Sequence, residues 1–192
     1  MPSGQSKMKK LLLVLLILIA VATALVFFSP YKSQSNRSYA IIKTIRIEAP
    51  QENLYNYLGN SDNAADWSSY VSHIETLNEP EFTDGEKGST RRCYQKDDKN
   101  NTWDERIELA YPYSYRRLSI YNLQGFPIES KALLTEQLYE GVDSTTTKLS
   151  LTLYLDPEKS DWTDHLKLFI ASYKVGSIFQ ANLEKIKKIN EE

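Results

Sequence analysis

The sequence predicts an α+β protein in which an antiparallel sheet wraps around one long C-terminal helix, with a separate apolar helix at the N-terminus. Residues 11–28 read LLLVLLILIAVATALVFF and carry no charge. Residues 38–155 divide into short runs of alternating polar and apolar residues, separated by turn-forming residues. Residues 162–189 contain no proline and a single glycine, Gly176, which is typical of one continuous helix.

The apolar stretch at residues 11–28 is long enough to cross a bilayer, because its eighteen residues span about 27 Å as a helix. A signal peptide cleaved at the A-x-A sequence of residues 22–24 is the alternative, but apolar residues continue beyond that point. We therefore expect residues 1–30 to be a single-pass anchor with a short basic tail. Lysines at positions 7, 9 and 10 outnumber the two basic residues that follow the span. This bias favours a cytoplasmic N-terminus and a periplasmic or extracellular domain.

The rest of the chain reads as a linker, residues 31–37, followed by one domain, residues 38–192. Residues 38–48 place isoleucines on one face at a period of two and form the first strand. Two short helices follow, and the second, capped by Asp62, extends through Tyr70. Further strands are expected at residues 73–77, 89–95, 102–110, 113–123, 131–139 and 145–155. Short turns join these strands, so the sheet is antiparallel and the domain belongs to the α+β class.

Charge and cysteine content limit the possible functions. Outside the first thirty residues, 20 Lys and Arg stand against 25 Asp and Glu, a net charge of −5. This sign argues against a nucleic-acid binder, which needs a concentrated basic surface. The single cysteine, Cys93, excludes an internal disulfide and reads as a buried structural thiol. His73 and His165 are far apart in the chain, so we expect neither a metal site nor another cofactor.

Four stretches of sequence carry a resemblance to a known superfamily. They are IEAPQENLYNYL at residues 47–58, SDNAADW at residues 61–67, WDERIEL at residues 103–109 and LEKIK at residues 183–187. In this order, the pattern resembles the START-like, helix-grip superfamily, which includes polyketide cyclase/dehydrase-like and lipid-transport proteins. The resemblance implies a curved sheet of about seven strands that grips the last helix, with a ligand cavity between them.

The candidate ligand-binding residues are aromatic side chains and one carboxylate: Trp67, Tyr70, Trp103, Glu105, Phe169 and Tyr173. Trp67 and Tyr70 are equally well explained as core packing. Glu105 shares an apolar strand face with Trp103, so it is either a cavity group with a raised pKa or the partner of a neighbouring arginine. We favour the ion pair, because buried charges are usually paired. The arginines that we expect as partners are Arg92, Arg116 and Arg117.

The long helix is expected to begin after a cap at Ser160 or Asp161 and to carry two apolar groups. The first group runs most of its length and should grip the sheet; it consists of Leu168, Val175, Phe179, Leu183 and Ile186. The second group exists only in the first half and consists of Leu166, Phe169, Ile170 and Tyr173. It stops at Gly176, where a helix can bend or let another backbone come close. We expect this second group either to close the cavity mouth or to meet the membrane.

Three functions remain open. The favoured one is a membrane-tethered module that binds an apolar or amphipathic small molecule, such as a lipid or an isoprenoid. The second is a small enzyme of the cyclase/dehydratase kind that uses Glu105 as acid or base. The third is a regulatory protein-interaction module whose cavity is filled. The first is favoured because the sequence has no G-x-S-x-G motif, no Cys–His spacing and no metal-ligand spacing. The sequence does not identify a protein partner.

Overall fold

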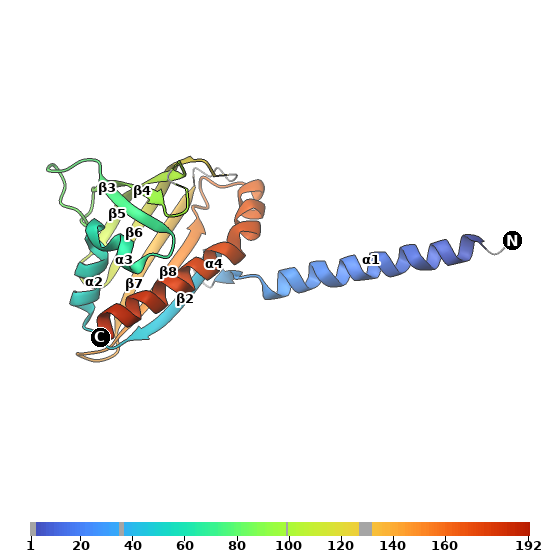
Figure 1. Ribbon diagram of the computed structural model, residues 1–192, viewed down its shortest axis with the longest axis horizontal. Helices are drawn as coiled ribbons and strands as arrows, with labels where there is room; N and C mark the ends of the chain where they lie inside the picture. The colour runs from blue at the N-terminus through green and yellow to red at the C-terminus, as the bar shows by residue number, and fades with distance from the viewer. Residues whose placement is uncertain (1–2, 35–36, 99, 127–131) are drawn as a thin grey trace.

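The computed structural model describes residues 3–34, 37–98, 100–126 and 132–192. In it, an antiparallel sheet curves around the C-terminal helix, and a long N-terminal helix extends away from the domain (Figure 1). The predicted fold class is confirmed. The elements are α1 (Ser3–Phe28), β1 (Tyr31–Gln34), β2 (Arg37–Ile47), α2 (Gln51–Gly59), a 3₁₀ turn η1 (Ser61–Asn63), α3 (Ala64–Trp67), β3 (Val71–Thr76), β4 (Thr90–Gln95), β5 (Thr102–Tyr111), β6 (Tyr115–Gln124), β7 (Leu133–Gly141), β8 (Thr147–Leu155) and α4 (Trp162–Glu191).

The sheet has eight strands in the order β1-β2-β8-β7-β6-β5-β4-β3, and every neighbouring pair is antiparallel. Strands β3 to β8 are neighbours in the sheet in chain order, as hairpin connections require. Strand β2 returns to pair with β8, so the first long strand and the last strand lie side by side. Strand β7 was expected to begin at residue 131, which lies outside the described residues; in the structure it begins at Leu133.

The segment expected as a linker, residues 31–37, contains strand β1. Tyr31 pairs with Ile41 of β2 and is only 7% exposed. Its hydroxyl lies 2.7 Å from Nδ1 of His165, and burial raises the pKa of Tyr31 to about 12. Residues 35–36 of this segment lie outside the described part of the chain. Four residues with one apolar side chain are too few for an alternating pattern, so the sequence did not predict a strand here.

The turn after α2 differs from the predicted second helix. Asn60, and not Asp62, is the capping residue, because its Oδ1 accepts a hydrogen bond from the Asp62 amide at 2.9 Å. A 3₁₀ turn and a four-residue helix follow, and the helix ends at Trp67. Tyr70 therefore lies in the loop beyond α3. The Ser68 hydroxyl accepts from the amides of Tyr70 and Val71, which satisfies two backbone donors outside the helix.

Helix α4 begins with the expected Asp161 cap, which accepts from the amides of Thr163 and Asp164 in a capping box. Gly176 allows the expected close approach: a Cβ at this position would lie 3.2 Å from the Pro30 side chain. Figure 1 also shows α4 changing direction between its first part and its longer C-terminal part.

Helix α1 projects from the domain (Figure 1), and the side chains described along it are exposed. Its segment Lys7–Phe28 is long and apolar enough to cross a membrane. A membrane anchor and a signal sequence both meet this criterion.

Candidate ligand-binding cavity

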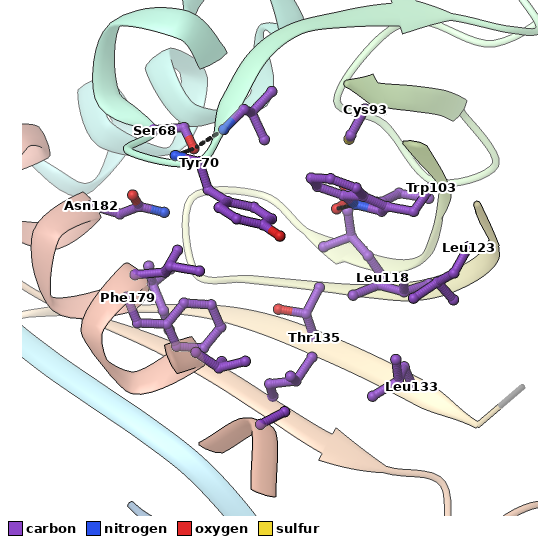
Figure 2. Close-up of a pocket in the computed structure, with 18 of the residues that line it drawn as sticks. Ser68, Tyr70, Cys93, Trp103, Leu118, Leu123, Leu133, Thr135, Phe179 and Asn182 are labelled. Carbon is purple, nitrogen blue, oxygen red and sulfur yellow. Dashed lines mark hydrogen bonds between the residues drawn. The ribbon is translucent and has the colours of Figure 1, made fainter. Parts of the chain in front are cut away.

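A cavity of about 490 Å³ lies between the sheet and α4. Its wall is mostly apolar and comes from β3 to β8, α3 and α4. Figure 2 shows Tyr70 and Trp103 on one side of the cavity, and Phe179 and Thr135 on other sides of it. The apolar residues of its floor and helix side include Leu118, Ile120, Leu133, Leu151, Leu153, Leu168, Ala171, Val175 and Phe179. The side chains of the described residues therefore leave this cavity open and do not fill it.

Aromatic rings line one wall of this cavity in a row. The Tyr70 and Trp103 ring centroids are 5.9 Å apart, and the Trp103 and Phe126 centroids are 5.8 Å apart in an edge-to-face arrangement. The Tyr70 hydroxyl donates to Oε1 of Gln95 at 3.1 Å, so its polar end is satisfied. Burial, followed by the charge of Asp97, raises the pKa of Tyr70. Of the predicted residues, Trp67, Tyr70, Trp103 and Glu105 all line the cavity.

Glu105 is held in the cavity wall by two donors. Nε of Arg91 donates to its Oε2 at 3.0 Å, and Nε1 of Trp103 donates to its Oε1 at 3.0 Å. The side chains of Arg91 and Glu105 are 6% and 13% exposed. Both carboxylate oxygens therefore have partners inside the protein, as the ion-pair interpretation of Glu105 predicted.

The predicted arginine partner of Glu105 was wrong, and the strand register explains why. Arg91 stands directly opposite Glu105 in the β4–β5 pair, whereas Arg92 stands opposite Asp104. A shift of one residue moves a side chain to the other face of a sheet, so Arg92 binds Asp104 outside the cavity at 2.7 Å. The pairing that would have identified Arg91 depends on the turn after Gln95, whose geometry the sequence pattern did not reveal.

The other two arginines expected near Glu105 do not pair with it. Arg116 is buried, donates to the carbonyl oxygens of Gly85 and Tyr55, and stacks 3.6 Å from the centroid of the Tyr55 ring. It therefore ties α2 and the Gly85 turn to the sheet. Arg117 belongs to the opposite face of β6, since successive residues of a strand alternate.

Asn182 of α4 fixes the loop that carries Tyr70. Its Oδ1 accepts hydrogen bonds from the Ser69 amide at 2.7 Å and the Ser69 hydroxyl at 2.8 Å. The Lys185 ammonium group donates to the Ser68 carbonyl oxygen at 3.2 Å. These bonds join the loop that carries Tyr70 to α4, and Figure 2 shows Asn182 of α4 close to this loop. Asn182 could have been identified from the sequence, because it is a polar residue on the face of the predicted helix that was expected to be buried.

Phe169 and Tyr173, which were expected to bind ligand and either to close the cavity mouth or to meet the membrane, are not among the residues that line the cavity. Phe169 packs against the core cluster that contains Tyr31 and Ile41 of β1 and β2. Tyr173 is 38% exposed, and its hydroxyl donates to the Leu25 carbonyl oxygen of α1 at 2.6 Å. The sequence did not predict β1, and so it did not provide the partner against which Phe169 packs.

Cys93 lines the cavity but is 1% exposed. Burial, followed by the nearby charge of Glu105, raises the pKa of the Cys93 thiol well above its ordinary value. The neutral thiol is a poor nucleophile. This supports the interpretation of Cys93 as a structural residue.

A curved antiparallel sheet, a gripped C-terminal helix and an internal cavity define a helix-grip-like α+β protein, and known structures share this fold. An uncharacterized protein from Bacillus thuringiensis superposes with a TM-score of 0.59 at 20% identity, covering 80% of this chain and 99% of its own. No family model matches the sequence, and no curated protein sequence matches it.

Three further structures share the fold, and two of them, DynU16 and BexL, are described by a biosynthetic locus or pathway. DynU16, from the dynemicin biosynthetic locus, has a TM-score of 0.55 at 11% identity over 78% of this chain and 46% of its own. The Aha1 dimer from Colwellia psychrerythraea has a TM-score of 0.54 at 16% identity over 79% of this chain and 96% of its own. The aromatase/cyclase di-domain protein BexL, from the BE-7585A pathway, has a TM-score of 0.50 at 17% identity over 76% of this chain and 46% of its own. At such identities, these likenesses show the fold alone.

Proposed function

We propose that this protein is a membrane-anchored binding protein for an apolar or amphipathic small molecule, a lipid or an isoprenoid-like compound, held between the sheet and α4. The cavity carries the proposal. Its volume of about 490 Å³ falls within the range of roughly 300–1,000 Å³ that is usual for small-molecule sites. Its wall combines many apolar side chains with few polar ones, the pattern that binds such ligands.

The proposed anchor is α1, with residues 11–28 inside the bilayer. The three lysines before the span support a cytoplasmic N-terminus and a domain on the periplasmic or extracellular side. Ser29 and Pro30 alone separate α1 from β1, so the domain stays next to the bilayer that would supply an apolar ligand.

The test is native mass spectrometry of the full chain released from nanodiscs made of one synthetic phospholipid. We expect an adduct of one small molecule per chain. Ala171→Trp, which fills the cavity from α4, should abolish the adduct. The matched control is Ser177→Trp, at an exposed position on the same helix, and it should keep the adduct. An absent adduct, or one that both variants retain equally, would contradict the proposed binding site.

A second candidate function is a cyclase or dehydratase in which Glu105 transfers a proton. Glu105 lines the cavity, and the ARO/CYC protein BexL from the BE-7585A biosynthetic pathway shares the fold. Against this role, both oxygens of Glu105 are already occupied by Arg91 and Trp103. Glu105→Gln separates the two functions: an enzyme loses nearly all turnover, whereas a binding protein loses stability and keeps the ligand adduct.

A further inference from the structure

The first half of α4 carries an apolar face that the described part of the chain leaves largely exposed. Trp162, Leu166, Ile170 and Tyr173 recur at helical spacing and lie on one side of the helix. Their side chains are 75%, 50%, 65% and 38% exposed. A contiguous exposed patch of this kind usually marks an interaction surface. We refer to these four residues as the outer face of α4.

The outer face lies beside the end of α1. The Tyr173 hydroxyl donates to the Leu25 carbonyl oxygen at 2.6 Å, and the hydroxyl oxygens of Ser29 and Ser172 are 3.3 Å apart. Figure 1 shows the first part of α4 at the end of the domain from which α1 leaves, running across the direction of α1. A helix that crosses the direction of a membrane span lies roughly parallel to the membrane surface.

We propose that the outer face of α4 rests on the lipid bilayer that α1 spans. This inference depends on the anchor of the proposed function, but not on what the cavity binds. Leu166 and Ile170 are suited to the acyl boundary, as in helices that lie in the membrane interface. Trp162 and Tyr173 have the amphipathic rings that are enriched at headgroup level.

Contacts at the end of α1 indicate the same membrane level. Nζ of Lys32 donates to the Phe27 carbonyl oxygen at 2.7 Å and lies 5.7 Å from the centroid of the Phe27 ring. A lysine that folds back on the last turn of a span is expected at the headgroups. Tyr173 binds to the same final turns of α1, so the outer face begins at the level where the span ends. This continuity favours the bilayer over a second copy of the chain as the occupant.

The test is tryptophan fluorescence of the full chain in nanodiscs that contain phosphatidylcholine with brominated acyl chains, which quench nearby indoles. The difference between wild type and Trp162→Phe isolates Trp162 from Trp67 and Trp103. We expect Trp162 to be strongly quenched relative to nanodiscs of unbrominated lipid. In a second variant, Leu166→Glu with Ile170→Glu, the Trp162 signal should lose most of this quenching.

The control is Trp162→Phe combined with Tyr111→Trp. Tyr111 is 57% exposed and is the last residue of β5, two residues before Tyr113, whose ring contacts Tyr55 of α2. Helix α2 is at the end of the domain away from α1 (Figure 1). Tryptophan at position 111 should therefore escape quenching. If Trp162 is quenched no more than this control, the inference is overturned.

Failure of the inference can be told apart from failure of the proposed function. An unquenched Trp162 in a chain that enters nanodiscs and carries the ligand adduct overturns the membrane contact alone. An unquenched Trp162 together with two cross-linked chains per nanodisc assigns the outer face to a second copy, and also overturns it. A full chain that does not enter nanodiscs overturns the anchor, and the membrane contact with it. Quenching without an adduct supports the membrane contact and counts against the cavity as a binding site.

Discussion

Arg91 and Glu105 form an ion pair in the wall of the cavity, with 3.0 Å between Nε and Oε2. They stand opposite each other on β4 and β5, and Trp103 donates to the second oxygen of the carboxylate. Burial alone would lower the pKa of Arg91, but the negative charges of Glu105 and Asp84 outweigh burial and raise it. The pair therefore places two compensated charges beside an apolar cavity.

Arg91→Met should destabilise the protein strongly, because it leaves the Glu105 carboxylate buried without its cation. Breaking a buried pair typically costs about 3–5 kcal/mol. The measurement is chemical denaturation of the full chain in a mild detergent, with tryptophan fluorescence as the signal that monitors unfolding. The double variant Arg91→Met/Glu105→Leu should recover much of the loss, since it removes both charges.

A surface ion pair provides the control for Arg91. Lys148 and Glu140 are 2.7 Å apart, with side chains 42% and 46% exposed. Lys148→Met should cost less than about 1 kcal/mol, because water screens such pairs. Equal effects of Arg91→Met and Lys148→Met would show that the cavity pair contributes no more than a surface pair.

Asp104 makes stability depend on pH in the acid range. Burial acts to raise its pKa, but hydrogen bonds from Arg92 and Asn122 outweigh burial and hold the pKa below its ordinary value. Its contribution to stability is therefore complete above the unfolded pKa of about 3.9 and is lost as the pH falls through the lower folded pKa. Asp104→Asn should cost about 1–2 kcal/mol at pH 7, a modest value because Arg92 is 35% exposed.

Melting temperatures of wild type and Asp104→Asn between pH 7 and pH 2 check this prediction. The difference between the two proteins should shrink as the pH falls below about 4. A difference that stays constant over this range would mean that the charge of Asp104 does not contribute.

The helix and strand periods predicted most of this fold, but contacts that depend on register or on an unpredicted neighbour were missed. The turn after Gln95 sets the β4–β5 register, and one residue of difference exchanges Arg91 for Arg92 as the partner of Glu105. Strand β1 has a single buried apolar residue, Tyr31, so the sequence pattern did not predict a strand there. Without β1, Phe169 looked free to line the cavity, although the structure packs it against the core beside Tyr31.

Cys93 should react with iodoacetamide only when the protein unfolds, because burial raises the thiol pKa and blocks access. Labelling at pH 8 should be slow for the folded full chain and should accelerate when denaturant is added. The control is Cys93→Ala/Ser177→Cys, which puts a thiol at an exposed position of α4 and should label rapidly in the folded state. Rapid labelling of Cys93 in the folded chain would mean that reagents enter the cavity freely.

Gly176 determines how closely α4 approaches the end of α1. A Cβ at this position would lie 3.2 Å and 3.3 Å from two side-chain atoms of Pro30, so Pro30 would have to shift by a few tenths of an ångström. Gly176→Ala should be nearly neutral, because the gain of up to about 1 kcal/mol in helix propensity offsets this shift. Gly176→Leu has no such room and should cost about 1–3 kcal/mol.

The larger side chain at position 176 should also push Pro30 away and weaken the hydrogen bond between Tyr173 and Leu25. Denaturation measures the stability of both variants, and the brominated-lipid experiment measures the contact of Trp162 with the bilayer. We expect Gly176→Leu to reduce the quenching of Trp162 and Gly176→Ala to leave it unchanged. Unchanged stability and quenching in Gly176→Leu would show that the joint between α1 and α4 is looser than the distance to Pro30 implies, because a tight joint cannot accept a leucine without moving.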